Sequence, residues 1–362
     1  MNKDQTDHAA HVGSHTNLLT DLSEVVGSAK SGTVDAIVVP TIAPQRVGSA
    51  IALAEALKCT IVLLCSTSSQ VRDIGKSYDL PSNALCLEAP PGYGHPLLDF
   101  EQRAMEKHTD IAMKRNIGLL LARLCGWRTI LFLDDDIRGM KPSLILRAAA
   151  LTEQYRVVGF QIPDFPDNSV VCHANRVSGG AQSTFVGGNA ILVDTSRADT
   201  YFPAIYNEDW LFLYDAVADR SVGVAGRLRQ LAYDPFARNA APEEFGELVA
   251  EGLVRALHFG SDVSTLSFWA DAIKKRSRFI DEVADRLHGS ARAKDERIPD
   301  RDRILLRLDE AKKRLLEISP VTCLSFYRTW RKNVDIWQRQ LLDLPTSLTP
   351  QQAVRYLRLS SE

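Results

Sequence analysis

Short apolar runs alternate with segments of helical periodicity along the first two thirds of the chain. The run "VDAIVVPT" predicts a buried strand that ends near a proline, and "QRVGSAIALAEALK" follows it with apolar residues at helical spacing. "CTIVLLCSTSS" and "TILFL" predict two more buried strands, and the helical pattern "DIAMKRNIGLLLARLCGW", with Gly126 near its end, precedes the second of them. Strands that alternate with helices predict an α/β fold with a mostly parallel, doubly wound sheet.

The middle of the chain continues this alternation with one long interruption. "KPSLILRAAALTEQ" predicts a helix and "RVVGFQI" a strand, after which a polar loop runs through Gly180. The paired glycines of "TFVGGNAILVD" then interrupt a strand, which indicates close approach of a ligand or of another backbone. "NEDWLFLYDAV" predicts a helix that opens on two acids, and "VGVAGRLRQLAYD" predicts a further strand.

These patterns divide the chain into three parts. Residues 1–33 are polar and mixed, and we expect a disordered or loosely ordered tail. Residues 34–260 carry the alternating strands and helices of the α/β domain. Residues 261–362 carry amphipathic helical patterns such as "FWADAIKKRSRFIDEVADRL", which predict a helical C-terminal extension. Its apolar stripes suit packing on the core, or a homo-oligomer formed through these helices.

Composition narrows the class of protein. The chain has 362 residues, 45% hydrophobic and 24% charged, with a net charge of -2, which fits a globular protein and leaves no electrostatic footprint for nucleic acid. Its six cysteines form no C-x-x-C pair, which favours a reducing compartment. The N-terminus lacks the pattern of a signal peptide and no apolar run predicts a transmembrane segment, so we expect a cytoplasmic protein.

Three adjacent carboxylates, Asp134, Asp135 and Asp136, end the strand "TILFL". Like charges this close raise one another's pKa, so a site that keeps them ionised needs a cation or strong hydrogen-bond donors. On an extended backbone Asp134 and Asp136 would share one face, which suits a hard divalent cation. Ligands of such sheets bind at the carboxyl ends of strands. The competing interpretation is that the aspartates only cap the following turn or helix.

The ordered series "AIVVPT", "KRN", "ILFLDDD", "GGNAILV" and "NEDWLF" resembles the GT-A nucleotide-sugar glycosyltransferases, especially family 2-like members, from about Val34 to Gly260. The resemblance implies a Rossmann-like GT-A fold and transfer of a sugar from a nucleotide-diphosphate sugar to an acceptor hydroxyl. It implies Mn²⁺ or Mg²⁺ as cofactor, held directly by Asp136, with Asp134 reaching the ribose or the metal. His258 would be a third metal ligand, although a lone histidine is more often structural.

The resemblance also implies roles for other residues. Asp209 would be the general base, with Glu208 supporting it and inversion at the anomeric carbon as the outcome; an ordinary acidic helix start is the competing interpretation. The residues expected to contact the nucleotide-sugar are Pro40, Thr41, Arg46, Ser66, Lys114, Arg115, Asn116, Asp134, Asp135, Gly187, Gly188 and Asn189. A solvated helix start for Lys114 and a simple β-bulge for the two glycines remain alternatives.

Several features stay open at this level. Many family 2 members end the second strand in acidic residues that read the base, whereas this chain has "CSTSS", where Ser66 and Thr67 would substitute, so this segment leaves the base open. Of the possible donors we expect a UDP-sugar, with a GDP-sugar as the alternative. The Q-x-x-R-W signature of processive synthases is absent, which favours a single transfer to an acceptor that the sequence does not identify. A retaining transferase and a non-catalytic nucleotide-sugar or glycan binding protein on the same scaffold are the alternatives.

Overall fold

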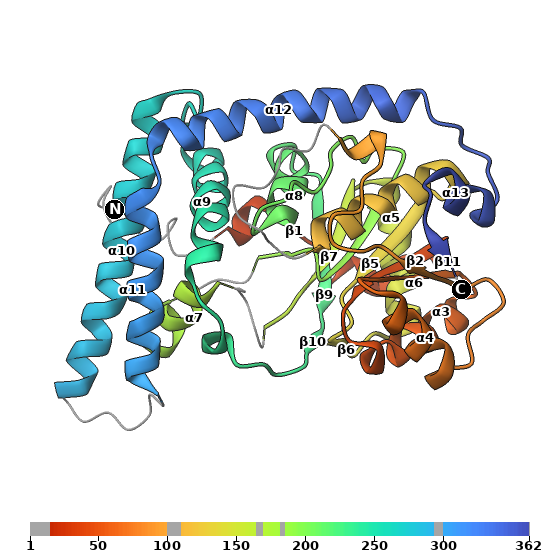
Figure 1. Ribbon diagram of the computed structural model, residues 1–362, viewed down its shortest axis with the longest axis horizontal. Coiled ribbons are helices and arrows are strands. Elements are labelled where there is room, and N and C mark those ends of the chain that lie inside the picture. Colours follow the sequence, from red (N-terminus) through yellow and green to blue (C-terminus); the bar gives the residue numbers. More distant parts are fainter. Residues whose placement is uncertain (1–14, 100–109, 164–168, 182–184, 293–299, 362) are drawn as a thin grey trace.

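A nine-stranded sheet forms the centre of the molecule (Figure 1). The computed structural model describes residues 15–99, 110–163, 169–181, 185–292 and 300–361. The strands lie in the order β1-β9-β7-β8-β5-β2-β3-β4-β11, and β10 and β6 form a separate pair. Their bounds are β1 (Thr20–Asp21), β2 (Ala36–Thr41), β3 (Thr60–Cys65), β4 (Leu85–Glu88), β5 (Thr129–Leu133), β6 (Ile137–Arg138), β7 (Val157–Gln161), β8 (Ala190–Asp194), β9 (Val222–Arg227), β10 (Arg229–Gln230) and β11 (Ser360–Ser361).

Helices connect these strands and make up most of the C-terminal third. They are α2 (Val25–Ser28), α3 (Gly48–Leu57), α4 (Ser68–Ser77), α5 (Ile111–Cys125), α6 (Pro142–Ala150), α7 (Val170–Val177), α8 (Glu208–Ala218), α9 (Glu244–Phe259), α10 (Leu266–Arg292), α11 (Arg301–Glu317), α12 (Pro320–Leu342) and α13 (Pro350–Tyr356). Short 3-10 helices are η1 (Thr16–Leu18), η2 (Pro44–Arg46), η3 (Pro96–Leu98), η4 (Leu151–Glu153), η5 (Pro235–Ala237) and η6 (Ala241–Glu243). Gly126 ends α5 in the left-handed conformation that favours glycine.

The predicted mostly parallel α/β sheet with flanking helices is confirmed, and this architecture is compatible with a GT-A fold. β2, β3, β4 and β5 pair in parallel, whereas β8 runs antiparallel to both of its neighbours. Side chains alternate between the two faces of the strands, so Val38 and Phe132 join one hydrophobic cluster and Ile37 and Leu131 join the other. Both faces are therefore buried, which explains the continuous apolar runs in the sequence.

The strand order reverses between β2 and β5. β3 and β4 continue the sheet on one side of β2, and β5 with the later strands continues it on the other. β2 pairs with β3 as far as Thr41 and Cys65, but its pairing with β5 stops at Val38 and Phe132. Pro40, which has no N–H to donate, lies beyond that last pair. The carboxyl ends of β2 and β5 therefore separate at a topological switch point, where open α/β sheets bind ligands.

Two segments are more ordered than we expected. Residues 1–14 lie outside the described residues, but from residue 15 the predicted loose tail contributes β1, which pairs with β9, and buries Leu18, Leu22 and Val26. The predicted polar loop through Gly180 contains α7. Ser169 caps this helix by accepting a hydrogen bond from the Cys172 N–H, a short local signal that the polar composition obscured.

The C-terminal helices share the core of the sheet. One hydrophobic cluster runs from Val38 and Phe132 through α9 to buried residues of α10, α11 and α12. Figure 1 shows α10 and α11 side by side, and α12 crossing from them toward α13 and the sheet edge. The chain then adds β11 antiparallel to β4, so this region, expected to be helical, also closes one sheet edge. Within the described ranges, no helix has the length and apolar character needed to cross a membrane.

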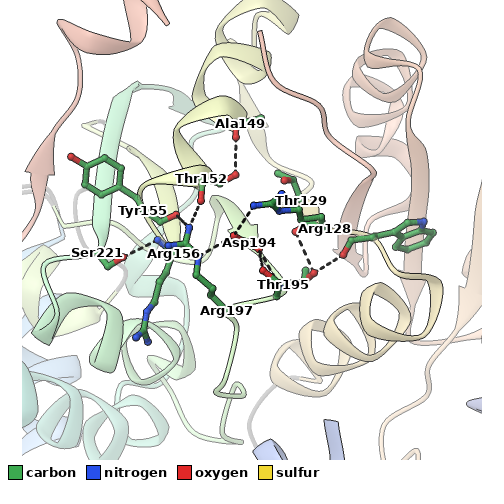
Figure 2. A network of polar contacts seen from close by, with 12 residues as sticks. Arg128, Thr129, Ala149, Thr152, Tyr155, Arg156, Asp194, Thr195, Arg197 and Ser221 are labelled. Carbon is green, nitrogen blue, oxygen red and sulfur yellow. Dashed lines mark hydrogen bonds and ion pairs between the residues drawn. The ribbon is translucent and has the colours of Figure 1, made fainter. Parts of the chain in front are cut away.

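A polar network lies where β8 ends and β5 begins, in the interior of the sheet (Figure 2). The Asp194 carboxylate is buried and accepts hydrogen bonds from Ser196 and from Arg197 Nε, the latter at 3.0 Å. Arg197 also donates to the carbonyls of Thr152 and Tyr155. These groups hydrogen-bond one another and lie at the start of β5, whereas the Asp134–Asp136 turn follows its end, so we assign them a structural role.

Replacing Asp194 with alanine should therefore lower the free energy of unfolding by about 3 kcal/mol, because hydrogen bonds to a charged group are each worth roughly 1.5–3 kcal/mol. Urea unfolding measures this change. Asp199→Ala is the matched control, since Asp199 is 48% exposed and pairs with Arg156 at 3.5 Å; an exposed ion pair contributes roughly 0–1 kcal/mol. Equal stability of the two variants would contradict the structural role of Asp194.

Candidate active site at the carboxyl ends of β2 and β5

The three aspartates leave β5 in a tight turn. Ile137 N donates to the Asp134 carbonyl at 3.2 Å and closes this turn. We expected an extended backbone with Asp134 and Asp136 on one face, and that expectation is wrong. The turn directs the three carboxylates to three different partners, Arg115, Thr41 and Gln230, which allows adjacent acids to coexist.

Asp135 links the separated ends of β2 and β5. Thr41 Oγ1 donates to Asp135 Oδ2 at 2.6 Å. Burial raises the pKa of Asp135, while this hydrogen bond and the charge of Arg46 act in the opposite direction. Arg46 is exposed at the end of η2, so its guanidinium faces solvent near the switch point and is available to an anion.

Lys114 is committed to the protein rather than to a ligand. Its buried ammonium group contacts the Thr41 carbonyl at 3.0 Å, Ser66 Oγ at 2.8 Å and Asp110 Oδ2 at 3.0 Å. These three contacts match its three N–H donors. Burial lowers the pKa of Lys114, and the Asp110 carboxylate opposes that effect. The structure therefore gives Lys114 a positioning role, joining the ends of β2 and β3 to α5, where we had expected a nucleotide contact.

Asn116 is also engaged inside the protein. Its side-chain amide donates to the Phe202 carbonyl and accepts from the Phe202 N–H, both at 2.8 Å. The Phe202 ring in turn lies 5.6 Å from the Arg115 guanidinium carbon. Asn116 thus fixes the segment against which Arg115 packs, and the expected direct contact with a nucleotide is replaced by this structural one.

Arg115 connects the aspartate turn with the start of α8. Its Nη2 donates to Asp134 Oδ1 at 3.0 Å, and its Nη1 donates to Glu208 Oε1. Burial raises the pKa of Asp134 to about 6, and Arg115 opposes that effect. Burial likewise raises the pKa of Glu208, again against the attraction of Arg115. The positive charge of Arg115 therefore offsets the negative charges of both Asp134 and Glu208.

Asp209 lies against the glycine turn that precedes β8. Asn207 adopts the left-handed conformation that asparagine tolerates, and α8 begins directly after it. Asp209 Oδ2 accepts a hydrogen bond from Gly188 N–H, and its Oδ1 accepts from Trp210 N–H at 2.9 Å. Asp209 is 9% exposed, so these backbone donors hold its carboxylate in one orientation with little access to water.

The close approach of the glycine turn explains why side chains are absent there. A Cβ on Gly188 would lie 2.6 Å from Arg115 Nη1 and 2.9 Å from Asp209 Cβ. We expect Gly188→Ala to lower the free energy of unfolding by about 1–3 kcal/mol, the usual cost of overpacking. Gly75→Ala in α4 is the control, because its Cβ would meet nothing within 4 Å. Equal urea midpoints for the two variants would contradict the close approach.

Asn189 connects the glycine turn with the aspartate turn. Its carbonyl accepts a hydrogen bond from Asp134 N–H at 2.9 Å. The side chain is 8% exposed, and its Oδ1 has no hydrogen-bond partner among the described residues. A Cβ placed on Gly187 would be 3.7 Å from this oxygen and 3.0 Å from Asp209 Oδ2. An acceptor without a donor therefore lies beside the Asp209 carboxylate.

Asp136 has a partner that the sequence did not indicate. Gln230 Nε2 on β10 donates to Asp136 Oδ2 at 2.9 Å, and Leu231 N donates to the Asp136 carbonyl at 2.9 Å. The second carboxylate oxygen, Oδ1, is buried and has no hydrogen-bond partner within the described residues. An orphaned, buried carboxylate oxygen beside a hydrogen-bonded one fits a ligand of a hard cation.

His258 does not join this group. It lies near the end of α9, where its Nε2 is 2.9 Å from His15 Nδ1, and His15 Nε2 is 3.1 Å from Glu251 Oε2. Within the described part of the chain, no three His, Cys, Asp or Glu side chains form a group that could hold a metal ion. The expected set of Asp134, Asp136 and His258 is therefore not assembled, because His258 is paired with the segment before β1.

Comparison with known proteins shows a distant likeness to a solved structure. The sequence matches no protein-family model and no curated protein. Among solved structures it is similar to the mannosyltransferase PcManGT from Pyrobaculum calidifontis, in complex with GDP-Man and Mn²⁺. The sequence identity is 12% and the TM-score 0.44, over 94% of this chain and 96% of that chain. A likeness this distant carries no functional argument, so the function has to be inferred from this chain's own residues.

Proposed function

We propose that this protein transfers a sugar from a nucleoside diphosphate sugar to an acceptor hydroxyl with the help of a divalent cation. The observation that carries the proposal is the single guanidinium of Arg115, which joins the aspartate turn to the start of α8. On one side of this bridge, Asp136 Oδ1 has no hydrogen-bond partner in the described part of the chain, and on the other side Gly188 N–H donates to Asp209. Transfer of this kind needs one acid for a cation and a second for a proton.

The donor side of the site lies at the carboxyl ends of β2 and β5. Asp136 would hold Mn²⁺ or Mg²⁺ with Asp134 next to it, and diphosphate oxygens would complete the coordination, since such cations are commonly bound through one or two carboxylates plus substrate phosphates. A cation bound there would supply stabilisation of the charge that develops on the diphosphate as the sugar leaves. Arg46 faces the same anion, and Thr41 and Ser66 mark the strand ends beside the nucleoside of a UDP- or GDP-sugar.

The acceptor side lies at the start of α8. Asp209 removes the proton from the attacking hydroxyl, and the N–H groups of Gly188 and Trp210 keep its carboxylate oriented. Glu208 supports this arrangement through Arg115. Attack from the side of Asp209 inverts the anomeric configuration. Asn189 Oδ1, which has no partner among the described residues and lies beside Asp209, would accept a hydrogen bond from a hydroxyl of the transferred sugar.

Release of nucleoside diphosphate tests the proposal before the acceptor is known. The wild-type protein, supplied with Mn²⁺ and a panel of UDP-, GDP- and dTDP-sugars, should hydrolyse one donor slowly, with water in place of the acceptor. The anomeric form of the released sugar, followed by NMR, should be inverted at first. Tight donor binding without any release, even with candidate acceptors added, would contradict the enzymatic proposal in favour of a binding protein.

A further inference from the structure

We propose that Gln230 is a direct ligand of the cation, through its side-chain amide oxygen, in the position for which the sequence suggested His258. This inference rests on the proposed function, because it concerns the cation held at Asp136. Nothing in the spacing of the sequence indicates it, since Gln230 lies 94 residues after Asp136. The two are brought together by the short pair of β10 with β6.

The backbone holds Gln230 in register with the aspartate turn. β10 pairs antiparallel with β6, and Gln230 lies opposite Ile137, the residue directly after Asp136. Leu231 N–H donates to the Asp136 carbonyl at 2.9 Å, so the strand is also tied to the turn itself. The backbone of Gln230 is therefore fixed beside the aspartate turn before any ligand arrives, which lowers the entropic cost of coordination.

The polar atoms at this contact are incompletely satisfied. The Gln230 amide nitrogen donates to Asp136 Oδ2 at 2.9 Å, whereas the amide oxygen Oε1 is buried without a partner among the described residues. The neighbouring Asp136 Oδ1 is orphaned in the same way. Buried polar atoms without partners are rare, and two on adjacent side chains point to a missing group that both oxygens can bind. Both are hard oxygen donors, which suits Mg²⁺ and Mn²⁺.

Binding requires only a local rearrangement. The terminal amide of glutamine rotates about a broad, roughly two-fold torsion, so Oε1 can turn from its present unpartnered position toward the Asp136 carboxylate, without movement of β10, and reach a cation held there. With the cation present, the amide oxygen would coordinate it, and the carboxylate would no longer need the amide donor. Gln230 and Asp136 then supply two protein ligands, and the donor's diphosphate supplies others.

Two substitutions show whether Gln230 acts as a cation ligand or only as a hydrogen-bond donor to Asp136. Gln230→Met keeps the length of the side chain but removes both polar atoms, whereas Gln230→Glu keeps an oxygen and loses the donor. Mn²⁺ is titrated into each full-length protein in the presence of equimolar UDP or GDP, and free Mn²⁺ is followed by electron paramagnetic resonance. Gln340→Ala is the control, because Gln340 also has a buried amide oxygen without a partner among the described residues but lies on α12, far from β10 (Figure 1).

If Gln230 is a ligand, Gln230→Met weakens Mn²⁺ binding by about 10-fold or more, the scale of losses around metal sites. Gln230→Glu binds at least as tightly as the wild type, and Gln340→Ala is unchanged. Weakening of similar size in both Gln230 variants would overturn the inference, since it would show that only the donated hydrogen bond matters. Unchanged binding in Gln230→Met would overturn it too, while leaving the proposed function intact.

Mn²⁺ binding by the wild-type protein shows whether a failed test concerns only the role of Gln230 or also the proposed function. If the wild type binds no Mn²⁺ with either nucleotide, both fail together. If it binds Mn²⁺ and only the Gln230 variants depart from expectation, the inference alone fails. Should Gln230→Met not fold, as its urea unfolding would reveal, Gln230→Glu still decides, because tighter or equal binding supports coordination and weaker binding excludes it.

Discussion

Asp136→Ala should remove the cation-dependent part of nucleotide binding almost completely. The substitution deletes the carboxylate whose buried Oδ1 has no hydrogen-bond partner within the described residues. Changes in the outer partners of a metal site already cost about 10–100-fold in affinity, so loss of a direct ligand should cost ~100-fold or more. Calorimetric titration of the nucleoside diphosphate, with and without Mn²⁺, measures this loss.

The matched control for this substitution is Asp219→Ala. Asp219 is 57% exposed and forms its ion pair with Arg156, which also pairs with Asp199. Removing it changes the net charge of the protein by the same amount but leaves the aspartate turn untouched, so the Mn²⁺ dependence should stay that of the wild type. A Mn²⁺ dependence that persists in Asp136→Ala would show that the cation binds elsewhere.

Asp209→Asn should leave donor binding nearly unchanged and remove most of the transfer. Asparagine keeps the size of the side chain and an oxygen that can still accept the Gly188 N–H, but it cannot take a proton from the acceptor. Loss of a general base typically lowers the rate by roughly 10²–10⁴-fold. The measurement is kcat for release of nucleoside diphosphate, together with the Kd of the donor.

The control here is Asp215→Asn on the same helix. Asp215 lies further along α8 and accepts hydrogen bonds from Arg331 on α12, at 2.8 and 2.9 Å. Its loss should affect stability and leave kcat near the wild-type value. If Asp209→Asn turned over at the wild-type rate, Asp209 would not be the base and the inverting mechanism would have to be abandoned.

The sequence predicted the sheet well because the strands that build it are buried on both faces. "AIVVPT", "TIVLLC" and "TILFL" are apolar except for one terminal threonine each, and they form β2, β3 and β5. The aspartates at the end of β5 were located for the same reason, since a buried strand must end where charges begin. The two-residue strands β1 and β11 were not predicted, because such short segments carry no periodicity and depend on their partners for hydrogen bonds.

The partners of the site residues depended on tertiary structure. The pattern of "MKRNIG" does not indicate that Lys114 contacts Thr41, Ser66 and Asp110. It also does not indicate that the Asn116 amide donates a hydrogen bond to the Phe202 carbonyl. Gln230 was missed because a lone glutamine in a polar segment carries no signal. His258 was misplaced because the segment before β1, taken for a loose tail, supplies His15 as its partner. Local patterns therefore located the carboxylates but not what each one contacts.

Calorimetric titration of the wild-type protein with UDP, GDP and dTDP, each with and without Mn²⁺, decides whether the chain has a cation-dependent donor site. We expect one of the three nucleotides to bind tightly only when Mn²⁺ is present, which would also identify the base of the donor. If none of the three bound under either condition, the protein would have no such site.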